Sequence, residues 1–460
     1  MLSILYVIRS AGHIRSHKST IEACVRRGNR VEVCYDPRFS NGGQIEKAQK
    51  LCESLHVSLA PARTPRAFGA WVLLYTRDLL SYRRYLVNRD IAHLELFRRD
   101  WKVHLPFPVR VFLALPGAAS LVMTRWFANM LTAVEGAFPA DTWIVRDIVG
   151  RKPDVVIVSP VNMRQSSAEL EYLKAARALH IKTVLPVFSW DNLTVRGLFH
   201  ILPDRVLCWN QPQADEARRH QGVPLDHIKI VGAPVFDPWF DHGLYTMPRD
   251  EFCRTFGLRA EDSIVTYLGS ARNIAQDETS VLRALRAAFD ASSDERIRKI
   301  QIILRVHPAN FKAYMGFSLS KTVEIPPRGS LPDTEEALKL FHDTLAHSIA
   351  VIQINTSGAI DAIIDGKPCI SLLYPEFATQ QVETIHFKQL MESGASDIPK
   401  TPQECVQNLI HLLDGDDARA HARRSFVESF IRPRGIEKTV GECVYEEVES
   451  LVGAKVAHAV

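Results

Sequence analysis

The stretch with the most chemical promise is 354–375, "INTSGAIDAIIDGKPCISLLYP". An apolar run ends at Thr356, Ser357 and Gly358, and a helical run then carries Asp361 one turn along. A helix that begins there presents unpaired backbone N–H groups and the positive end of its dipole. This pattern predicts an anion site, with Asp361 placed for a ribose diol. A plain N-cap followed by a glycine stop is the competing interpretation.

Two more apolar runs end in residues that suit an anion. "LGSARN" places Gly269 and Ser270 after the first run, and "LRVHPAN" ends the second with Arg305 and His307. Residues spaced by two lie on one face of a strand, so the cation and the imidazole would point the same way, as a phosphate site requires. An ordinary strand-to-helix turn and a structural His–Pro turn are the simpler explanations. We predict a donor site that combines these residues with those of 356–361.

The N-terminal half offers two candidates for a general base. His13 follows the first apolar run in "AGHIRS", and an imidazole there could take a proton from an acceptor hydroxyl. Asp191 lies in "FSWDNLT", after another such run, and could serve as the base or bind the acceptor. A structural histidine and an Asx-turn aspartate are the alternatives.

The elements that must position these residues are short strands that alternate with helices. Strand-like runs stand near 4–9, 30–36, 154–160, 182–190, 204–210 and 228–234, and a second series begins near 263. Such alternation indicates parallel βαβ units. In an open parallel sheet, ligands gather at the carboxyl ends of the strands, where the residues named above are expected.

A length of 460 residues predicts two or three domains. We expect an N-terminal Rossmann-like domain over 1–240, with a helical insertion at about 66–150, and a C-terminal Rossmann-like domain over 241–435. A turn-rich linker is expected near 235–250. The last segment, 436–460, is predicted to be a helix that packs back on the first domain.

Charge and composition exclude some classes of protein. The net charge is only +4, so the whole chain is no polyanion or nucleic-acid binder. Residues 61–150 carry 12 Lys/Arg against 7 Asp/Glu and are rich in aromatic residues. We expect most of these aromatics to form a core, and the basic face to make a weak peripheral contact with an anionic acceptor or a membrane.

The eight cysteines are scattered without a CxxC, which predicts reduced, mostly buried thiols in a cytosolic protein and no zinc site. The first 13 residues are interrupted by Arg9 and lack a cleavage pattern, so they read as a buried strand and not as a signal peptide. The longest uncharged run, 111–124, contains Pro116 and is too short to cross a bilayer as a helix. A cytoplasmic location, with peripheral contact at the inner face of the membrane, is the expectation.

Three motifs together resemble the GT-B glycosyltransferases. "GHIRSHKSTIEACVRRGNRVEV" is similar to the family's opening Gly-His loop and helix. "KIVGAPVFDPW" resembles the turn that leads into the second domain, and "SGAIDAIIDGKPCISL" resembles the donor signature. The resemblance covers most of the chain but rests on short motifs. Asp361 stands where the family usually has Glu, and His13 lacks the fuller Gly-rich loop of many relatives.

The resemblance implies an α/β protein with two doubly wound Rossmann-like domains facing a cleft, in which the domain over 1–240 binds the acceptor and the domain over 241–435 binds the nucleotide-sugar. It implies that Ser357 and Gly358 cradle the donor diphosphate and that Asp361 holds the ribose, with no metal and no cofactor besides the nucleotide-sugar. "RVHP" and "INTSGAID" also resemble bacterial capsule, polysialyl and glycerophosphate polymer transferases, in which a His-Pro motif contacts a cytidine nucleotide. The donor is therefore expected to be linked to UDP, or to CMP or CDP.

The predicted function is transfer of a sugar from a nucleotide-sugar to a hydroxyl of a glycan or lipid-linked acceptor in bacterial surface polysaccharide synthesis. Two alternatives stay open. A non-hydrolysing UDP-sugar 2-epimerase would share the fold and the donor signature but would need no acceptor. A non-catalytic nucleotide-sugar-binding partner would bind the donor without turnover.

Overall fold

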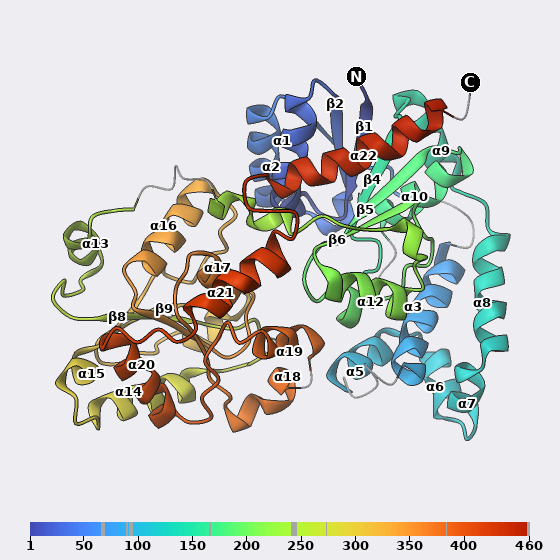
Figure 1. Ribbon diagram of the computed structural model, residues 1–460. Helices are drawn as coiled ribbons and strands as arrows, with labels where there is room; N and C mark the ends of the chain where they lie inside the picture. The colour runs from blue at the N-terminus through green and yellow to red at the C-terminus, as the bar shows by residue number, and fades with distance from the viewer. Residues whose placement is uncertain are drawn as a thin grey trace. The chain divides into compact units, whose positions relative to one another are not determined.

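The computed structural model describes residues 1–65, 70–88, 91, 95–164, 167–240, 246–272, 274–382 and 384–457. The chain forms two compact units, one made of 1–237 together with 430–460 and the other of 238–429 (Figure 1). Each unit is built around its own parallel sheet. The α/β class with two Rossmann-like units, expected from the alternation of strands and helices, is confirmed.

The first unit contains a seven-stranded parallel sheet in the order β3-β2-β1-β4-β5-β6-β7. Its strands are β1 (Ser3–Ile8), β2 (Arg30–Tyr35), β3 (Ser58–Pro61), β4 (Val155–Ser159), β5 (Lys182–Pro186), β6 (Arg205–Cys208) and β7 (Ile228–Ile230). Every residue of β4 is buried, as expected for a strand covered on both faces. The strand order reverses between β1 and β4, and this reversal is where doubly wound sheets bind ligands.

Helices α1 (Lys18–Arg26), α2 (Gly42–Ser54), α10 (Ala168–Ala178), α11 (Asn192–Val195) and α12 (Gln211–Gln221) connect these strands. Between β3 and β4 lies the helical insertion that the sequence predicted. It consists of α3 (Ala70–Val87), α5 (Glu95–His104), α6 (Phe107–Ala114), α7 (Ala118–Met123), α8 (Arg125–Ala137) and α9 (Thr142–Arg151). Part of the predicted range, 66–69, 89–90 and 92–94, lies outside the described residues.

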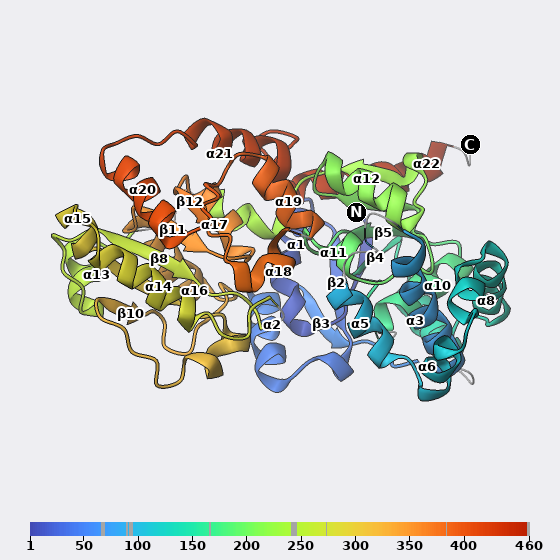
Figure 2. The same cartoon turned by 90° about the horizontal axis from the view of Figure 1, so that it is seen from below.

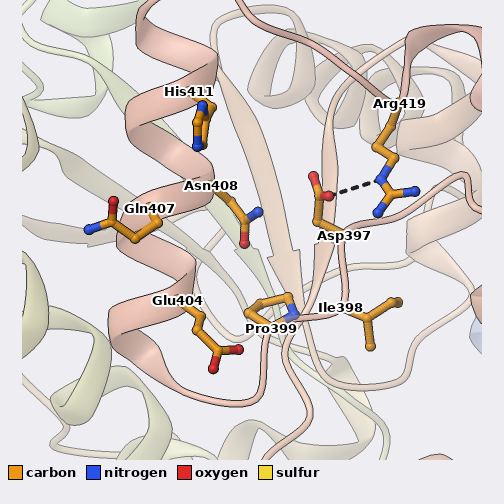
Figure 3. Close-up of a pocket in the computed structure, with 8 residues that line it drawn as sticks. All are labelled: Asp397, Ile398, Pro399, Glu404, Gln407, Asn408, His411 and Arg419. Carbon is orange, nitrogen blue, oxygen red and sulfur yellow. Dashed lines mark hydrogen bonds and ion pairs between the residues drawn. The ribbon is translucent and has the colours of Figure 1, made fainter.

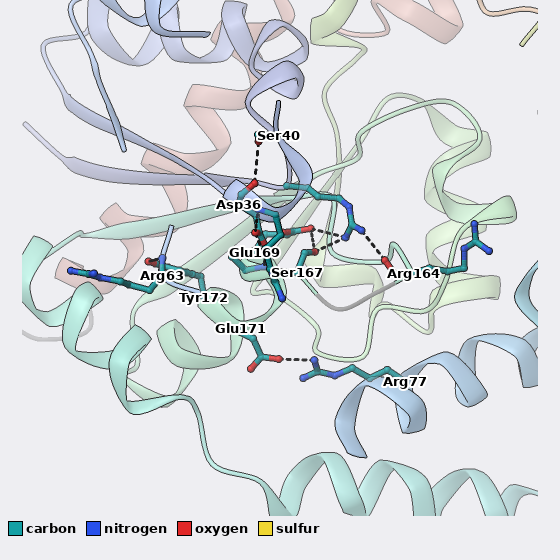
Figure 4. Close-up of polar contacts among 12 residues, drawn as sticks. Asp36, Ser40, Arg63, Arg77, Arg164, Ser167, Glu169, Glu171 and Tyr172 are labelled. Carbon is teal, nitrogen blue, oxygen red and sulfur yellow. Dashed lines mark hydrogen bonds and ion pairs between the residues drawn. The ribbon is translucent and has the colours of Figure 1, made fainter. Parts of the chain in front are cut away.

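A buried ion network holds the insertion against α10. The Arg77 guanidinium donates to Glu135 at 2.7 and 2.8 Å and to Glu171 at 2.6 Å, and Lys174 donates to Glu135 at 2.8 Å. Burial by itself would raise the pKa of Glu135, but the hydrogen bonds and charges of Arg77 and Lys174 outweigh it and lower that pKa to about 2. The insertion is thus attached to α10 of the sheet domain by buried ion pairs, of which Figure 4 shows the pair between Arg77 and Glu171.

The C-terminal helix α22 (Val440–Ala457) belongs to the first unit, where it lies beside α1 (Figure 1). The two helices approach so closely that a Cβ atom on Gly441 would stand 2.2 Å from the Ser19 carbonyl oxygen. Glycine is therefore needed at this crossing. Asp237 accepts the backbone N–H groups of Val440 and Gly441 at 3.1 and 3.0 Å and so caps the start of α22.

The second unit has a five-stranded parallel sheet in the order β10-β9-β8-β11-β12. The strands are β8 (Ile264–Leu268), β9 (Gln301–Arg305), β10 (Thr322–Glu324), β11 (Ala350–Gln353) and β12 (Cys369–Ser371). The helices are α13 (Arg249–Phe256), α14 (Thr279–Asp290), α15 (Glu295–Lys299), α16 (Glu335–Ala346), α17 (Gly358–Ile364), α18 (Ala378–Val382), α19 (Ile385–Glu392), α20 (Pro402–Leu413) and α21 (Ala420–Phe426) (Figure 2). Here the order reverses between β8 and β11.

Three chain-wide properties bear on function. All eight cysteines are buried free thiols, which confirms the prediction of unpaired, buried cysteines. Across the described ranges no group of three or more His, Cys, Asp or Glu side chains is arranged to hold a metal ion. None of the helices in the described part of the chain has the length and apolar character needed to cross a membrane.

Candidate functional site

The second unit brings all the predicted donor residues to one edge of its sheet. Gly269 and Ser270 follow β8, Arg305 ends β9 with His307 two residues on, and 356–361 follow β11. Strand β8 pairs with both β9 and β11, so these three ends are neighbours at the reversal of strand order. We refer to this group of residues as the β8–β11 edge.

Arg305 is the strongest feature of the β8–β11 edge. The residue is only 6% exposed, and its guanidinium carbon lies 4.3 Å from the centre of the Phe341 ring on α16. Among the described residues its Nη1 has no hydrogen-bond partner. Burial lowers the pKa of Arg305 to about 10, and the Asp361 carboxylate acts in the opposite direction. The side chain is therefore a charged, desolvated donor at neutral pH, which is costly unless an anion binds it.

Asp361 lies one turn into α17 and is 8% exposed. Its negative charge raises the pKa of Arg305. Asp361, which we predicted to bind a ribose, is therefore also the electrostatic counterpart of the buried cation. Arg305 ends β9 and Asp361 follows β11, and both reach one edge of the sheet because β8 alone separates these two strands. Neither the contact with Phe341 nor the electrostatic effect of Asp361 on Arg305 could be predicted from spacing along the chain.

Gly269 lies where the backbone is crowded, at the end of β8. Its N–H donates to the Arg305 carbonyl at 2.9 Å, and a Cβ atom would stand 3.3 Å from that oxygen and 3.3 Å from the Tyr314 hydroxyl. Tyr314, from the 3-10 helix Pro308–Tyr314, is 4% exposed, and its hydroxyl has no partner within the described part of the chain. The Tyr314 hydroxyl is thus a second unpartnered polar group among the described residues at the β8–β11 edge, after the Arg305 guanidinium, and sequence reasoning missed it.

Ser270 is engaged by an acid that sequence reasoning also missed. Its backbone N–H donates to Glu278 Oε1 at 2.7 Å, and the Tyr267 hydroxyl donates to Glu278 Oε2 at 2.6 Å. Burial raises the pKa of Glu278 to about 7, although these two hydrogen bonds act to lower it. The Ser270 N–H is thus already used within the protein, which makes Ser270 a supporting residue of the turn and not a backbone donor to a ligand.

The turn into α17 is more self-contained than predicted. The Gly358 N–H donates to Thr356 Oγ1 at 3.4 Å and the Ala359 N–H donates to the Thr356 carbonyl at 3.2 Å. The structure differs from the expectation of unpaired N–H groups at the start of this helix, because the hydroxyl and the carbonyl of Thr356 accept the N–H groups of Gly358 and Ala359, as in an ST turn. Ser357 makes no side-chain cap and is exposed. Gly358 still permits a close approach, since a Cβ atom would lie 3.0 Å from Leu268.

His307 has one structural and one available nitrogen. Nδ1 accepts the Ala309 N–H at 3.1 Å and so caps the following 3-10 helix. An accepting Nδ1 places the proton on Nε2, which becomes a hydrogen-bond donor. Burial lowers the pKa of His307, so the ring is neutral at neutral pH and would contact a phosphate as a donor and not as a cation.

In the first unit, His13 lies within the 3-10 helix Ala11–His17 that follows β1. Its ring packs against Phe188, with 4.4 Å between ring centres, and Nδ1 is buried with no partner in the described ranges. Burial, followed by the charges of Arg9, Arg15 and Arg196, lowers the pKa of His13 to about 4. The imidazole is therefore unprotonated at neutral pH, although a pKa this low makes it a weak base.

Asp191 is the N-cap of α11, three residues beyond Phe188. The Ser189 hydroxyl donates to Oδ1 at 2.5 Å, and Arg196 lies 3.7 Å from Oδ2. The loops after β1 and β5 meet at one edge because β4 alone separates these strands. His13 and Asp191 are thus brought to the same edge of the first sheet, with Phe188 packed against the imidazole.

Arg9, which the sequence marked only as an interruption, anchors a polar cluster at the end of β1. It donates to Ser167 Oγ at 2.7 Å and to the Arg164 carbonyl at 2.8 Å, and it lies 3.7 Å over the Phe39 ring. Ser167 donates to Glu169, which is fully buried and whose pKa burial raises to about 7 (Figure 4). This cluster joins the end of β1 to Arg164 and Ser167, at the reversal of strand order in the first sheet.

A surface pocket of about 320 Å³ lies elsewhere in the second unit, between α20 and the segment 397–399 (Figure 3). Arg419 and Asp397 form an ion pair of 3.0 Å within it and neutralise each other. The pocket is lined by Asp397, Ile398, Pro399, Glu404, Gln407, Asn408, His411 and Arg419, and none of the predicted site residues is among them.

No protein-family model matches the chain, and no curated protein matches its sequence. Solved structures do match. The UDP-GlcNAc 2-epimerase of Methanocaldococcus jannaschii gives a TM-score of 0.55 at 14% identity, over 97% of this chain and 99% of the other. MnaA of S. aureus, solved with UDP, gives a TM-score of 0.54 at 11% identity, over 98% of this chain and 97% of the other.

A glycosyltransferase from Rickettsia africae gives a TM-score of 0.52 at 10% identity, over 98% of both chains. These matches extend over both units of the chain. The protein has the GT-B fold that the sequence motifs predicted.

Proposed function

We propose that this chain is a glycosyltransferase that moves a sugar from a nucleotide donor, bound at the β8–β11 edge, to an acceptor hydroxyl. The observation that carries the proposal is Arg305, a desolvated cation with an unpartnered Nη1 among the described residues, at the strand-order reversal. An anionic group, such as the phosphates of a nucleotide-sugar, would satisfy it. The GT-B fold supports the proposal, because solved proteins of this fold include one described as a glycosyltransferase and one solved with UDP.

The chemistry proposed for the donor residues follows from where charge develops. As the bond between the sugar and the leaving phosphate breaks, negative charge grows on the phosphate oxygens. Arg305, the His307 Nε2–H and the Tyr314 hydroxyl would stabilise that charge, and a single preorganised donor is typically worth about 3–4 kcal/mol. The Asp361 carboxylate would accept hydrogen bonds from the ribose hydroxyls. The helix α17 has only seven residues and its first N–H groups are used, so we give its dipole a secondary part.

The acceptor would bind to the first unit. His13 is our first choice for the base that takes the proton of the attacking hydroxyl, because its unprotonated imidazole follows β1 at the reversal of strand order. Asp191, held by Ser189 and Arg196, is the second choice. A glycan or lipid-linked acceptor in bacterial surface polysaccharide synthesis is the class we propose.

A second candidate is a UDP-sugar 2-epimerase, favoured by the match to the Methanocaldococcus jannaschii enzyme. The two reactions differ in their products. A transferase leaves the label of a donor sugar on an acceptor, whereas an epimerase returns a nucleotide-sugar without any acceptor.

The test begins with a thermal-shift screen of the protein against UDP, CMP, CDP, GDP and ADP. A nucleotide at 100 times its dissociation constant adds about 2.7 kcal/mol to stability, which identifies the base of the donor. The corresponding labelled nucleotide-sugars are then incubated with and without glycan and lipid-linked acceptors. Label on an acceptor supports transfer, and an epimer formed without acceptor supports the second candidate. Absence of a shift with every nucleotide would contradict both.

A further inference from the structure

The helical insertion exposes an unusual number of apolar side chains. Among the residues that the structure describes, 19 large apolar side chains are exposed, and eight of them lie between residues 103 and 130. Phe107 is 69% exposed, Trp126 66%, and Leu115 56%. Scattered single apolar residues are normal on a protein surface, but a concentration of this kind marks an interaction site. The full set is Val103, Phe107, Val111, Leu115, Leu121, Met123, Trp126 and Met130.

Six of these residues lie on the exposed faces of α6, α7 and α8, while Val103 lies near the end of α5 and Leu115 directly follows α6. On α8, Phe127 and Leu131 are buried, while Trp126 and Met130, four residues apart, are exposed. On α6, Leu113 is buried and Phe107 and Val111 are exposed. A helix at the surface of a soluble domain normally carries polar residues on its outer face. These helices are apolar on both faces, and Figure 1 shows α6 and α7 at the end of the insertion away from the sheet.

The charge of this surface has one sign only. Residues 101–134 contain no Asp or Glu, and they carry Lys102, Arg110 and Arg125. Arg125 is exposed beside Trp126, and the Arg110 guanidinium lies 5.9 Å from the Phe107 ring centre. Aromatic side chains next to Lys and Arg are the combination that binds at the interface of an anionic bilayer. We call the eight apolar residues and these three cations the insertion surface.

The insertion surface is also preformed. Arg83 donates to the carbonyls of Val122 and Met123 at 2.8 and 2.7 Å, where α7 ends and α8 begins. Because the half-buried Arg83 donates to these carbonyls, they do not depend on water for their hydrogen bonds. The exposed side chains around it can therefore enter a less polar environment without leaving that backbone unpaired.

We propose that the insertion surface binds the headgroup region of an anionic lipid bilayer. A second copy of the chain fits less well, because two such surfaces would bring cations against cations with no acid to pair them. A bilayer rich in acidic phospholipid supplies the missing negative charge and accepts the aromatic and aliphatic side chains. This proposal rests on residues 83–130 alone and does not depend on the proposed function.

Co-sedimentation with vesicles tests the proposal on the full chain. One set of vesicles contains phosphatidylcholine only, and the other an equal mixture with phosphatidylglycerol. We expect binding to the mixed vesicles that weakens as salt is raised. Phe107→Ser and Trp126→Ser should each weaken partitioning about tenfold, because each removes one aromatic side chain that would be transferred from water into the bilayer interface. Arg125→Gln should weaken it about fivefold, the effect of one cation near an acidic surface.

Leu225→Ser is the matched control, since Leu225 is 64% exposed in the first unit but lies outside the insertion. It should bind the mixed vesicles as the wild type does, and circular dichroism should show all four variants folded. Failure of the wild type to bind the mixed vesicles would overturn the proposal. So would binding that Phe107→Ser and Trp126→Ser leave unchanged. A dimer in analytical ultracentrifugation that Trp126→Ser dissociates would show that a second copy covers this surface, and would also overturn it.

Discussion

Arg432 donates from Nη2 to Asp237 Oδ1 at 2.7 Å, and the two side chains are only 4% and 5% exposed. The pair lies where the chain leaves the first unit and where it re-enters it. The Asp237 carboxylate also accepts the first backbone N–H groups of α22. One buried acid thus neutralises a buried cation and caps the C-terminal helix.

Replacing that acid should strongly destabilise the first unit. Asp237→Ala leaves a buried guanidinium without its counter-ion, and such changes cost about 3–5 kcal/mol. Urea unfolding followed by circular dichroism measures the difference. Asp226→Ala is the control, because Asp226 is 83% exposed and its loss should change the unfolding free energy by less than about 0.5 kcal/mol. Equal effects of the two substitutions would contradict this account of Asp237.

The crossing of α1 and α22 should respond to a single methyl group. Gly441→Ala would place its Cβ 2.2 Å from the Ser19 carbonyl oxygen, and the resulting displacement of the helices should cost about 1–3 kcal/mol. Gly453→Ala, in the same helix, meets nothing within 4 Å and should stabilise the protein by about 0.5–1 kcal/mol. Thermal unfolding of the two variants and the wild type measures both changes in stability. Effects of the same sign would show that α22 does not pack as described.

Glu278 should make the second unit less stable as pH rises. Its pKa is about 7 in the folded protein against an ordinary value of 4.5, so the folded state holds a proton that the unfolded state has lost between these values. Stability therefore falls as pH increases from 4.5 to about 7, by about 3 kcal/mol in total, and changes no further above that range.

The measurement is the difference in unfolding free energy between the wild type and Glu278→Gln, taken across this range of pH. The substitution also alters the hydrogen bonds with Ser270 and Tyr267, but this contribution to the unfolding free energy does not depend on pH. Any variation of the difference with pH therefore comes from titration of the Glu278 carboxyl group. Glu261→Gln, at an exposed position, is the control and should leave the pH dependence unchanged. A difference that does not vary with pH would show that Glu278 titrates normally.

His13 should titrate near pH 4, because burial is the main cause of its lowered pKa. Phe188→Ala removes the ring that packs against the imidazole and should raise the pKa of His13 toward its ordinary value of 6.5. Proton NMR of the ring Cε1–H, assigned by its loss in His13→Gln, follows both titrations. A wild-type titration near pH 6.5 would mean that His13 is solvated in solution.

Much of the fold could be predicted from the sequence because a buried parallel strand consists of a short run of apolar residues, which is easily recognised. The runs that became β1, β4, β8 and β9 are continuous and apolar, and they were placed correctly. Two edge strands, β3 and β10, were not predicted, since each has only three or four residues and a mixed composition. At the edge of a sheet, pairing with a single neighbour decides the structure, and local sequence does not record it.

The candidate site was predictable only in its strand ends. Arg305 and Asp361 were identified because each follows or ends a recognisable run. Phe341, Tyr314 and Glu278 come from elements that reach the β8–β11 edge through the tertiary fold, and no local pattern marks them. The turn at Thr356 was misread for a related reason. Whether the N–H groups at a helix start are available to a ligand depends on the local backbone turn and on the rotamer of a side chain such as Thr356, and the sequence specifies neither.

The most direct test of the central claim is isothermal titration of the preferred nucleotide into the wild type and Arg305→Met. The substitution replaces the guanidinium with an apolar side chain of similar length, but it leaves the buried Asp361 carboxylate without its electrostatic counterpart. The variant should therefore be less stable than the wild type, and circular dichroism checks that it is folded at the temperature of the titration. Its affinity for the nucleotide should fall about 10–100-fold, because charge-assisted hydrogen bonds to the phosphates are lost. A folded Arg305→Met variant that binds the nucleotide as tightly as the wild type would contradict the placement of the donor at the β8–β11 edge.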